Sequence, residues 1–209
     1  MVRRGSYAKG VAKRQEILRA ALDVVAREGY RGASVRQIAD AVGLSQAGLL
    51  HYFDSKEELF TEILRTRDQV DQAAFEPPPS TSPSIARLID GYLRTVRHNA
   101  EVPGLVQLFS RLAVDGADPQ HPAHRYFVER GTALRSASGE VVAQAQREGI
   151  VTDAVPAETI CRMLQAISDG MQLQWMLEPE TDMAEVVRAL FLVLAPGAVD
   201  AGEAGDAAS

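Results

Sequence analysis

Apolar residues recur at intervals of three and four along almost the whole chain of 209 residues, and this spacing constrains the fold more than any other feature. Such intervals place apolar side chains on one face of a helix, whereas a half-buried strand alternates apolar and polar residues. Almost no segment shows that alternation, and Gly or Pro separates the periodic stretches. The sequence therefore predicts an all-α fold.

These breakers divide the chain into a series of expected helices. The first is expected over residues 7–27, with Gly29 as its C-cap. Shorter helices are expected near 35–42, 46–52 and 56–74, followed by four or five more near 84–100, 103–114, 123–148, 157–177 and 182–194. The Pro-rich residues 77–83 predict a hinge or exposed linker, and the Ala- and Gly-rich residues 196–209 predict a disordered tail.

Residues 34–56 carry the local signals of two short helices joined by a tight turn. Ser34 and Gln37 have the spacing of a capping box, which satisfies the free amides at the start of a helix. Gly43 permits the left-handed backbone conformation that a tight turn requires, and Ser45 can cap the next helix. Apolar contacts between the two helices are expected from Ile38, Val42, Leu44 and Leu49, beside the small Ala39. This is the layout of a helix-turn-helix.

The second short helix is expected to read DNA, because its outward residues suit the edges of base pairs. The DNA-binding candidates are Arg36, Ser45, Gln46, Ala47, Gly48, His51, Tyr52 and Lys56. Gln46 can pair with adenine through two hydrogen bonds, and Tyr52 can donate to a phosphate oxygen. Ala47 and Gly48 are small enough to let the helix enter the major groove deeply.

A phosphate clamp is expected where the following helix begins at Lys56. Ser55 and Glu58 have the spacing of a second capping box. The free amides at the helix start and the ammonium of Lys56 both favour an anion. Basic residues further upstream can add phosphate or minor-groove contacts, namely Arg3, Arg4, Lys9, Lys13 and Arg14.

The charge of the chain is divided unevenly between its two ends. Residues 1–56 contain ten Lys or Arg and five Asp or Glu, a net charge of +5, whereas the remaining residues contain 12 and 23, a net charge of −11. The total of −6 therefore hides a basic head that suits an anionic polymer. We expect a DNA-binding domain at residues 1–56, a helical effector-binding and dimerisation domain at 57–195, and the tail at 196–209.

Several short motifs occur in order within residues 9–65. They are KRQEILRAA (13–21), EGY (28–30), VRQIA (35–39), VGLS (42–45), LLHYF (49–53) and SKEEL (55–59). With these motifs, the segment resembles the N-terminal domain of the tetracycline-repressor (TetR) family. The resemblance implies a three-helix DNA-binding head, an all-α body that dimerises and binds an effector, and release of DNA when a small molecule binds. It also implies phosphate contacts near Tyr52 and Lys56 and base reading from the helix that begins at Ser45.

The resemblance leaves the base preference and the direction of control open. Many family members carry Tyr or a Thr-Val-Tyr type of sequence where this chain has Ala47-Gly48-Leu49, so a base preference does not transfer. Repression is the usual mode of the family, and activation is the alternative.

The last two expected helices carry apolar stripes at helical spacing. One stripe comprises Ile160, Leu164, Ile167, Met171 and Trp175, and the other Val186, Ala189, Leu190, Val193 and Leu194. They can form a four-helix homodimer interface or bury the core of one chain, and we expect both. A dimer would place two recognition helices about 34–36 Å apart on a near-palindromic operator.

An effector pocket is expected among the helices of the body, lined mainly by apolar and aromatic groups. The candidates are Tyr92, Phe109, Tyr126, Phe127, Met171 and Trp175, with His98 or Gln172 to orient the ligand. The alternative is that these side chains are ordinary core residues. The effector itself, an unidentified small molecule, is expected to be apolar or aromatic.

No pattern in the sequence points to an enzyme, a metal or a cofactor. A nucleophile paired with a base at motif spacing and a Gly-rich phosphate loop are both missing, which disfavours an all-α enzyme. His121 and His124 lack neighbouring Cys or clustered carboxylates, so loop positions are favoured over a metal site. A helical adaptor that binds only protein would not need the basic head.

The sequence also bears on where the chain resides. The lone Cys161 is expected in the core and excludes an internal disulfide. No apolar stretch approaches the roughly 20 residues of a membrane span, so we expect no membrane partner and a cytoplasmic location.

Overall fold

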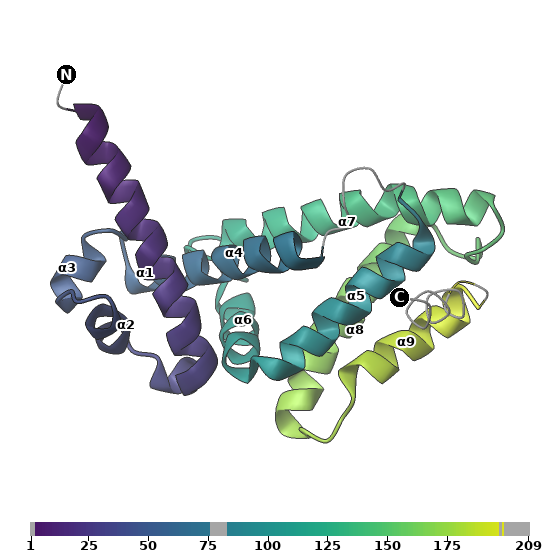
Figure 1. Ribbon diagram of the computed structural model, residues 1–209. Coiled ribbons are helices and arrows are strands. Elements are labelled where there is room, and N and C mark those ends of the chain that lie inside the picture. Colours follow the sequence, from purple (N-terminus) through teal and green to yellow (C-terminus); the bar gives the residue numbers. More distant parts are fainter. Residues whose placement is uncertain (1–2, 76–82, 197, 199–209) are drawn as a thin grey trace, which may run out of the picture. The chain divides into compact units, whose positions relative to one another are not determined.

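The computed structural model describes residues 3–75, 83–196 and 198, which form nine helices and no strand (Figure 1). The helices are α1 (Arg3–Gly32), α2 (Val35–Ala41), α3 (Gln46–Leu50), α4 (Lys56–Phe75), α5 (Ile85–Glu101), α6 (Pro103–Asp115), α7 (His124–Arg147), α8 (Ala157–Leu177) and α9 (Met183–Leu194). The predicted all-α fold is confirmed. The expected linker before Pro83 and most of the expected tail lie outside the described residues.

The helix boundaries follow from local capping chemistry. Gly29 has φ 70° and ψ 166°, so it interrupts the helical backbone of α1 near its end, but helical residues continue from it to Gly32. Pro103 occupies the first turn of α6, where a missing amide hydrogen costs nothing. The side chain of Asp182 accepts hydrogen bonds from the amides of Ala184 and Glu185 and so starts α9.

The chain divides into two compact units. The first contains Met1–Ala73 and Val102–Phe127, and the second contains Ala74–Glu101 and Val128–Ser209. Helices α4 and α6 therefore belong mainly to the same unit as the helix-turn-helix. The functional boundary expected at residue 56 is a separate matter from this structural division, and it stays a prediction.

The first unit is built around α1, which packs against both α2 and α6. Its core includes Ile17, Leu18, Leu59 and Ile63, each at most 1% exposed. The approach of α6 to α1 is so close that a Cβ on Gly104 would lie 2.0 Å from the carbonyl oxygen of Val25. Glycine is therefore required at this crossing.

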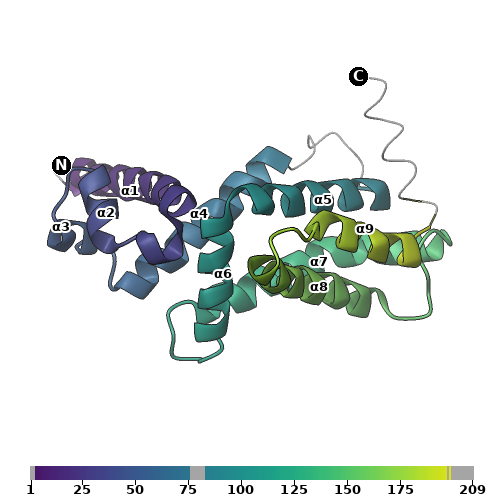
Figure 2. The same cartoon turned by 90° about the horizontal axis from the view of Figure 1, so that it is seen from below.

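The second unit contains α5, α8, α9 and residues 128–147 of α7. Helix α9 packs against α5 and α8, as Figure 2 shows. The core includes Ile89, Val142, Ile160, Leu164 and Phe191, and Cys161 is buried with them as expected. In the part of the chain that the structure describes, no helix is both long and apolar enough to cross a bilayer.

Candidate nucleic-acid interface and ligand pocket

The α2–turn–α3 segment is held by the caps that the sequence predicts. The Ser34 hydroxyl accepts from the amide of Gln37 at 3.2 Å, and the Gln37 side-chain oxygen accepts from the amide of Ser34 at 2.9 Å. Gly43 has φ 68°, which gives the tight turn, and Ser45 accepts from the amide of Gly48 at 3.0 Å. These bonds fix the start of each helix and the turn between them.

Apolar side chains lock α3 onto α2. Ile38, Ala39 and Leu49 are fully buried, while Val42 and Leu44 are partly buried against the same core. Because Leu49 faces inward, the opposite side of α3 faces outward. The core positions predicted for this segment are confirmed.

The predicted DNA-binding residues form the outer side of this segment. Ser45, Gln46, Ala47, His51 and Lys56 are exposed, whereas Gly48 and Tyr52 are half-buried. The ring of Tyr52 meets the His51 ring edge to face, with centroids 6.1 Å apart, and also packs against the core. Arg36 is exposed on α2, with its guanidinium Nε 3.8 Å from a carboxylate oxygen of Asp40.

The first turn of α4 is capped in a slightly different way from the prediction. The Glu58 amide donates to the Ser55 hydroxyl at 3.0 Å, as expected. The reciprocal bond to the Glu58 carboxylate comes from the amide of Asp54 rather than from that of Ser55. The ammonium of Lys56 lies 5.6 Å from the centroid of the Phe60 ring, which leaves this cation at the exposed start of the helix.

Arg14 has a structural position that sequence reasoning missed. Its guanidinium pairs with Glu58 and Glu62, each at 3.1 Å, and lies 4.7 Å from the centroid of the Phe53 ring. Its Nε also donates to the carbonyl oxygen of Tyr52 at 3.4 Å. The expected phosphate contact therefore competes with four contacts inside the protein. The four-residue spacing of the two glutamates, which puts both on one face of α4, is the signal in the sequence.

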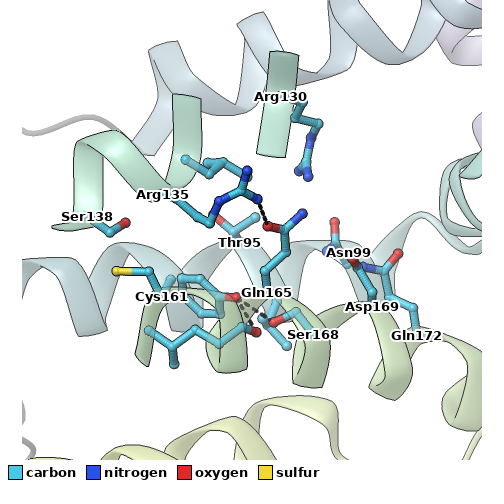
Figure 3. Close-up of a pocket in the computed structure, with 14 residues that line it drawn as sticks. Thr95, Asn99, Arg130, Arg135, Ser138, Cys161, Gln165, Ser168, Asp169 and Gln172 are labelled. Atoms are coloured by element: carbon cyan, nitrogen blue, oxygen red, sulfur yellow. Dashed lines mark hydrogen bonds between the residues drawn. The ribbon is translucent and has the colours of Figure 1, made fainter. Parts of the chain in front are cut away.

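The second unit contains a cavity of about 150 Å³ between α5, α7 and α8 (Figure 3). Of the predicted ligand residues, Tyr92 and Gln172 line it. Met171 and Trp175 pack in the core of this unit, and His98 lies on α5, but none of the three lines the cavity. Phe109, Tyr126 and Phe127 instead pack in the core of the first unit.

Most polar residues of the cavity escaped the sequence analysis. They include Asn99 on α5, Arg130 and Arg135 on α7, and Gln165, Ser168 and Asp169 on α8. Residues 165, 168, 169 and 172 follow the spacing i, i+3, i+4 and i+7, which places these polar side chains along one side of α8. This spacing is the feature of the sequence that could have indicated the polar wall of the cavity.

Hydrogen bonds hold several of the side chains that line this cavity in place. The Tyr92 hydroxyl lies 2.8 Å from the carbonyl oxygen of Leu164 and 2.7 Å from the Ser168 hydroxyl. Burial raises the pKa of Tyr92 to about 12, so this phenol stays neutral. Arg135 donates to the side-chain oxygen of Gln165 at 2.9 Å, drawn as a dashed line in Figure 3. Burial also raises the pKa of Asp169, and the positive charge of Arg130 opposes this effect.

The two histidines that were weighed as metal ligands contact the backbone of their own loop. The Ala123 amide donates to the ring of His121 at 3.2 Å, and a ring nitrogen of His124 lies 2.9 Å from the carbonyl oxygen of Gly116. Both side chains therefore support the chain reversal before α7.

Comparisons with known proteins agree with this architecture. Residues 17–63 match the family described as bacterial regulatory proteins, tetR family. The chain is 27% identical to the HTH-type transcriptional repressor AcnR of Corynebacterium diphtheriae over 84% of this chain and 87% of that protein. A TetR transcription regulator from Haloarcula marismortui has a similar structure, with a TM-score of 0.70, 24% identity and coverage of 91% and 98%. A transcriptional regulator from Saccharomonospora viridis in complex with choline gives a TM-score of 0.68, 20% identity and coverage of 87% and 96%.

The family match falls on the helix-turn-helix, and the similar structures cover both compact units. Residues 17–63 therefore match the N-terminal domain of the tetR family of bacterial regulatory proteins, and over most of its length the chain resembles transcriptional regulators of this family in sequence and fold.

Proposed function

We propose that this chain is a homodimeric repressor that binds a near-palindromic operator and leaves it when a small molecule occupies the cavity of the second unit. The observation that carries the proposal is the outer side of α3, where Gln46 and His51 are exposed, followed along the chain by the exposed Lys56 at the start of α4. In this assignment residues 1–56 bind DNA, and residues 57–195 bind the effector and dimerise. A repressor of this kind works in the cytoplasm, where the chromosome lies.

The DNA-binding roles follow from exposure and chemistry. Gln46, at the first position of α3, reads an adenine in the major groove. Ser45, Ala47, Gly48 and His51 complete the surface that approaches the base edges. Tyr52, Lys56 and Arg36 hold the backbone phosphates, because a phenol hydroxyl, an ammonium and a guanidinium can each donate to a phosphate oxygen.

Exposed apolar side chains on α8 and α9 support the dimer. Leu173 and Leu177 are 50% and 83% exposed on α8, and Val186 and Val193 are 41% and 77% exposed on α9. The pairs are four and seven residues apart, so each pair lies on one side of its helix. Two copies of these faces would form the four-helix interface that places two recognition helices one turn of DNA apart.

A ligand controls such a protein only through different affinities for two arrangements of the dimer. The cavity between α5, α7 and α8 is the site proposed for that ligand, because polar groups converge there within apolar walls. The similar regulator from Saccharomonospora viridis was crystallised in complex with choline. This supports the proposal that a helical domain of this fold binds a small molecule.

The experiment that tests the proposal is fluorescence anisotropy with the full-length protein and duplexes from its own upstream DNA. A scrambled duplex of equal length is the control, and the salt concentration is varied. Saturable, salt-sensitive binding to one upstream duplex is the expected result. Equal binding to the native and scrambled duplexes at every salt concentration would contradict recognition of a nearby operator.

A further inference from the structure

The size of the cavity between α5, α7 and α8 limits its occupant. Its volume is about 150 Å³, which matches an engineered protein cavity of about 150 Å³ that binds benzene. Val96, Leu134 and Leu164 contribute apolar walls. A molecule with one small ring therefore fits, whereas a long acyl chain does not fit within this volume.

One hydrogen-bond acceptor at one end of the cavity has no donor. Gln172 is 7% exposed, and its side-chain oxygen is buried with no partner among the described residues. Asp169, one turn earlier on α8, adds a carboxylate to the same end, and Figure 3 groups both with Asn99. A buried acceptor without a donor is costly, so an occupant gains by bringing a hydroxyl or amino hydrogen here.

The other polar feature of the cavity is an excess of positive charge. Two arginines, Arg130 and Arg135, line it with a single carboxylate, that of Asp169. The guanidinium of Arg135 donates to Gln165 at 2.9 Å and to Thr132 at 3.4 Å, and both of these partners are neutral. Its charge is therefore not balanced by an ion pair within the described residues, and a ligand carboxylate can bind it.

Figure 3 places Arg135 and the group of Asn99, Asp169 and Gln172 in different halves of the cavity. The hydrogen-bond donor for Gln172 and the negative charge for Arg135 must therefore lie at different ends of one small molecule. We propose that the effector is a small ring carboxylic acid that carries a hydrogen-bond donor on the side opposite its carboxylate. Arg135 binds the carboxylate, Gln172 and Asp169 accept from the donor, and the ring packs on the apolar walls. The inference rests on the proposed function in that the cavity is taken as the effector site.

The probe that combines these features is 4-hydroxybenzoate, and three related compounds test them. Benzoate lacks the donor, 4-hydroxybenzamide lacks the negative charge, and benzylamine reverses the charge and also lacks the hydroxyl group. Isothermal titration calorimetry of the full-length protein is expected to show that 4-hydroxybenzoate binds tightest, with each change costing about tenfold or more in Kd. Equal binding of the amide, tighter binding of benzylamine, or no binding of 4-hydroxybenzoate would overturn the proposal.

Variants assign the two ends separately. Arg135→Gln should abolish the preference for 4-hydroxybenzoate over 4-hydroxybenzamide, and Gln172→Leu should abolish the preference over benzoate. Arg162→Gln is the matched control, because Arg162 lies exposed on α8 with only Glu158 as its partner at 3.6 Å. The affinities of the four probes are also compared on the unaltered protein. A variant that misfolds therefore leaves the test of the ligand class intact.

Displacement of operator DNA separates this inference from the proposed function. If 4-hydroxybenzoate binds but leaves the anisotropy of the DNA complex unchanged, the ligand class stands and the effector role of the cavity fails. If another compound releases the DNA while 4-hydroxybenzoate does not bind, the regulatory function stands and the ligand class is overturned. Binding accompanied by release of DNA is the expected result.

Discussion

The guanidinium of Arg14 lies 3.1 Å from the carboxylate of Glu58, although 44 residues separate them in the chain. Arg14 is on α1, and Glu58 is in the first turn of α4, two residues after Lys56. The same carboxylate accepts from the amide of Asp54, so it connects α1 to the segment that leads out of α3. One ion pair thus fixes the proposed phosphate clamp relative to the core.

Replacing Arg14 by Met should lower the free energy of unfolding by about 1–2 kcal/mol, because the partly buried carboxylates of Glu58 and Glu62 each lose one charged partner. DNA binding should weaken by a similar factor on every sequence, since Lys56 and Tyr52 lose their support rather than a base contact. Urea denaturation measures the first effect, and anisotropy on native and scrambled duplexes measures the second.

A matched control for Arg14 is available on α6. Arg111 is 62% exposed and pairs with Asp115 at 3.3 Å, so Arg111→Met should change stability by less than about 0.5 kcal/mol. Equal losses for the two variants would mean that the Arg14 contacts contribute no more than a surface pair.

At the crossing of α1 and α6, the addition of a single methyl group to Gly104 should strongly destabilise the protein. In Gly104→Ala the new Cβ would lie 2.0 Å from the carbonyl oxygen of Val25 and 2.8 Å from the Cα of Gly29. Both neighbours are backbone atoms, so the helices must separate, at an expected cost of at least about 2–3 kcal/mol.

Thermal unfolding compares this variant with Gly139→Ala on α7. A Cβ at Gly139 meets nothing within 4 Å, so alanine should stabilise the helix by about 0.5–1 kcal/mol. A Gly104→Ala protein as stable as the wild type would show that α6 does not approach α1 this closely.

The proposed roles of Gln46 and Lys56 predict two different kinds of defect. Gln46→Ala should remove the preference at one base pair, at a cost of about 1–3 kcal/mol, and leave the salt dependence unchanged. Lys56→Ala should weaken binding to all sequences and reduce the slope of log Kd against log salt by about one. Anisotropy on a set of single-base operator variants, at several salt concentrations, distinguishes them. A shared, sequence-independent defect would refute the assignment of Gln46 to a base.

The helix-turn-helix could be predicted from the sequence because its signals are local. Ser34 with Gln37, Gly43 and Ser45 each act within four residues, so their caps and turn need no knowledge of the rest of the fold. The reciprocal cap of α4 was displaced by one residue, onto the amide of Asp54. Such a shift depends on how the chain enters the helix, which residue types alone do not specify.

The cavity could not be predicted in the same way, because aromatic side chains look alike in a core and in a pocket. Phe109 and Tyr126 pack in the first unit, whereas Tyr92 lines the cavity, and the three occur in similar helical patterns. Arg135 and Asp169 line the same cavity only because α7 and α8 pack together. Contacts between helices determine which side chains line the cavity. These contacts depend on pairs of residues far apart in the sequence.

The burial of Asp169 predicts a pH dependence of stability. Its pKa is raised mainly by burial, so the protonated carboxyl is favoured in the folded protein. The associated stability is complete below the ordinary carboxyl pKa of about 4 and is lost as the pH rises through the raised value. Asp169→Asn cannot lose this proton and should therefore be more stable than the wild type at pH 7. Urea denaturation from pH 3 to pH 8 should show the two proteins diverging only above about pH 4, and a constant difference would exclude this titration.

The exposed apolar residues of α8 and α9 predict the assembly state. A chain of 22.6 kDa should sediment at twice that mass, because Leu173 on α8 and Val193 on α9 are 50% and 77% exposed within the described chain. Leu173→Glu with Val193→Glu should give a folded monomer, since four charges would meet at the interface of a symmetric dimer. Val128→Glu is the control, as Val128 is 54% exposed on α7, outside the proposed interface.

Sedimentation equilibrium measures the mass of these proteins, and anisotropy measures their DNA binding. The monomeric variant should lose nearly all specific affinity while keeping weak, salt-sensitive binding, because a single recognition helix reads only half of a palindrome. A double variant that remains dimeric would place the interface elsewhere. A monomer that still binds the full operator tightly would show that one head is sufficient, and the proposed control through two arrangements of the dimer would then fail.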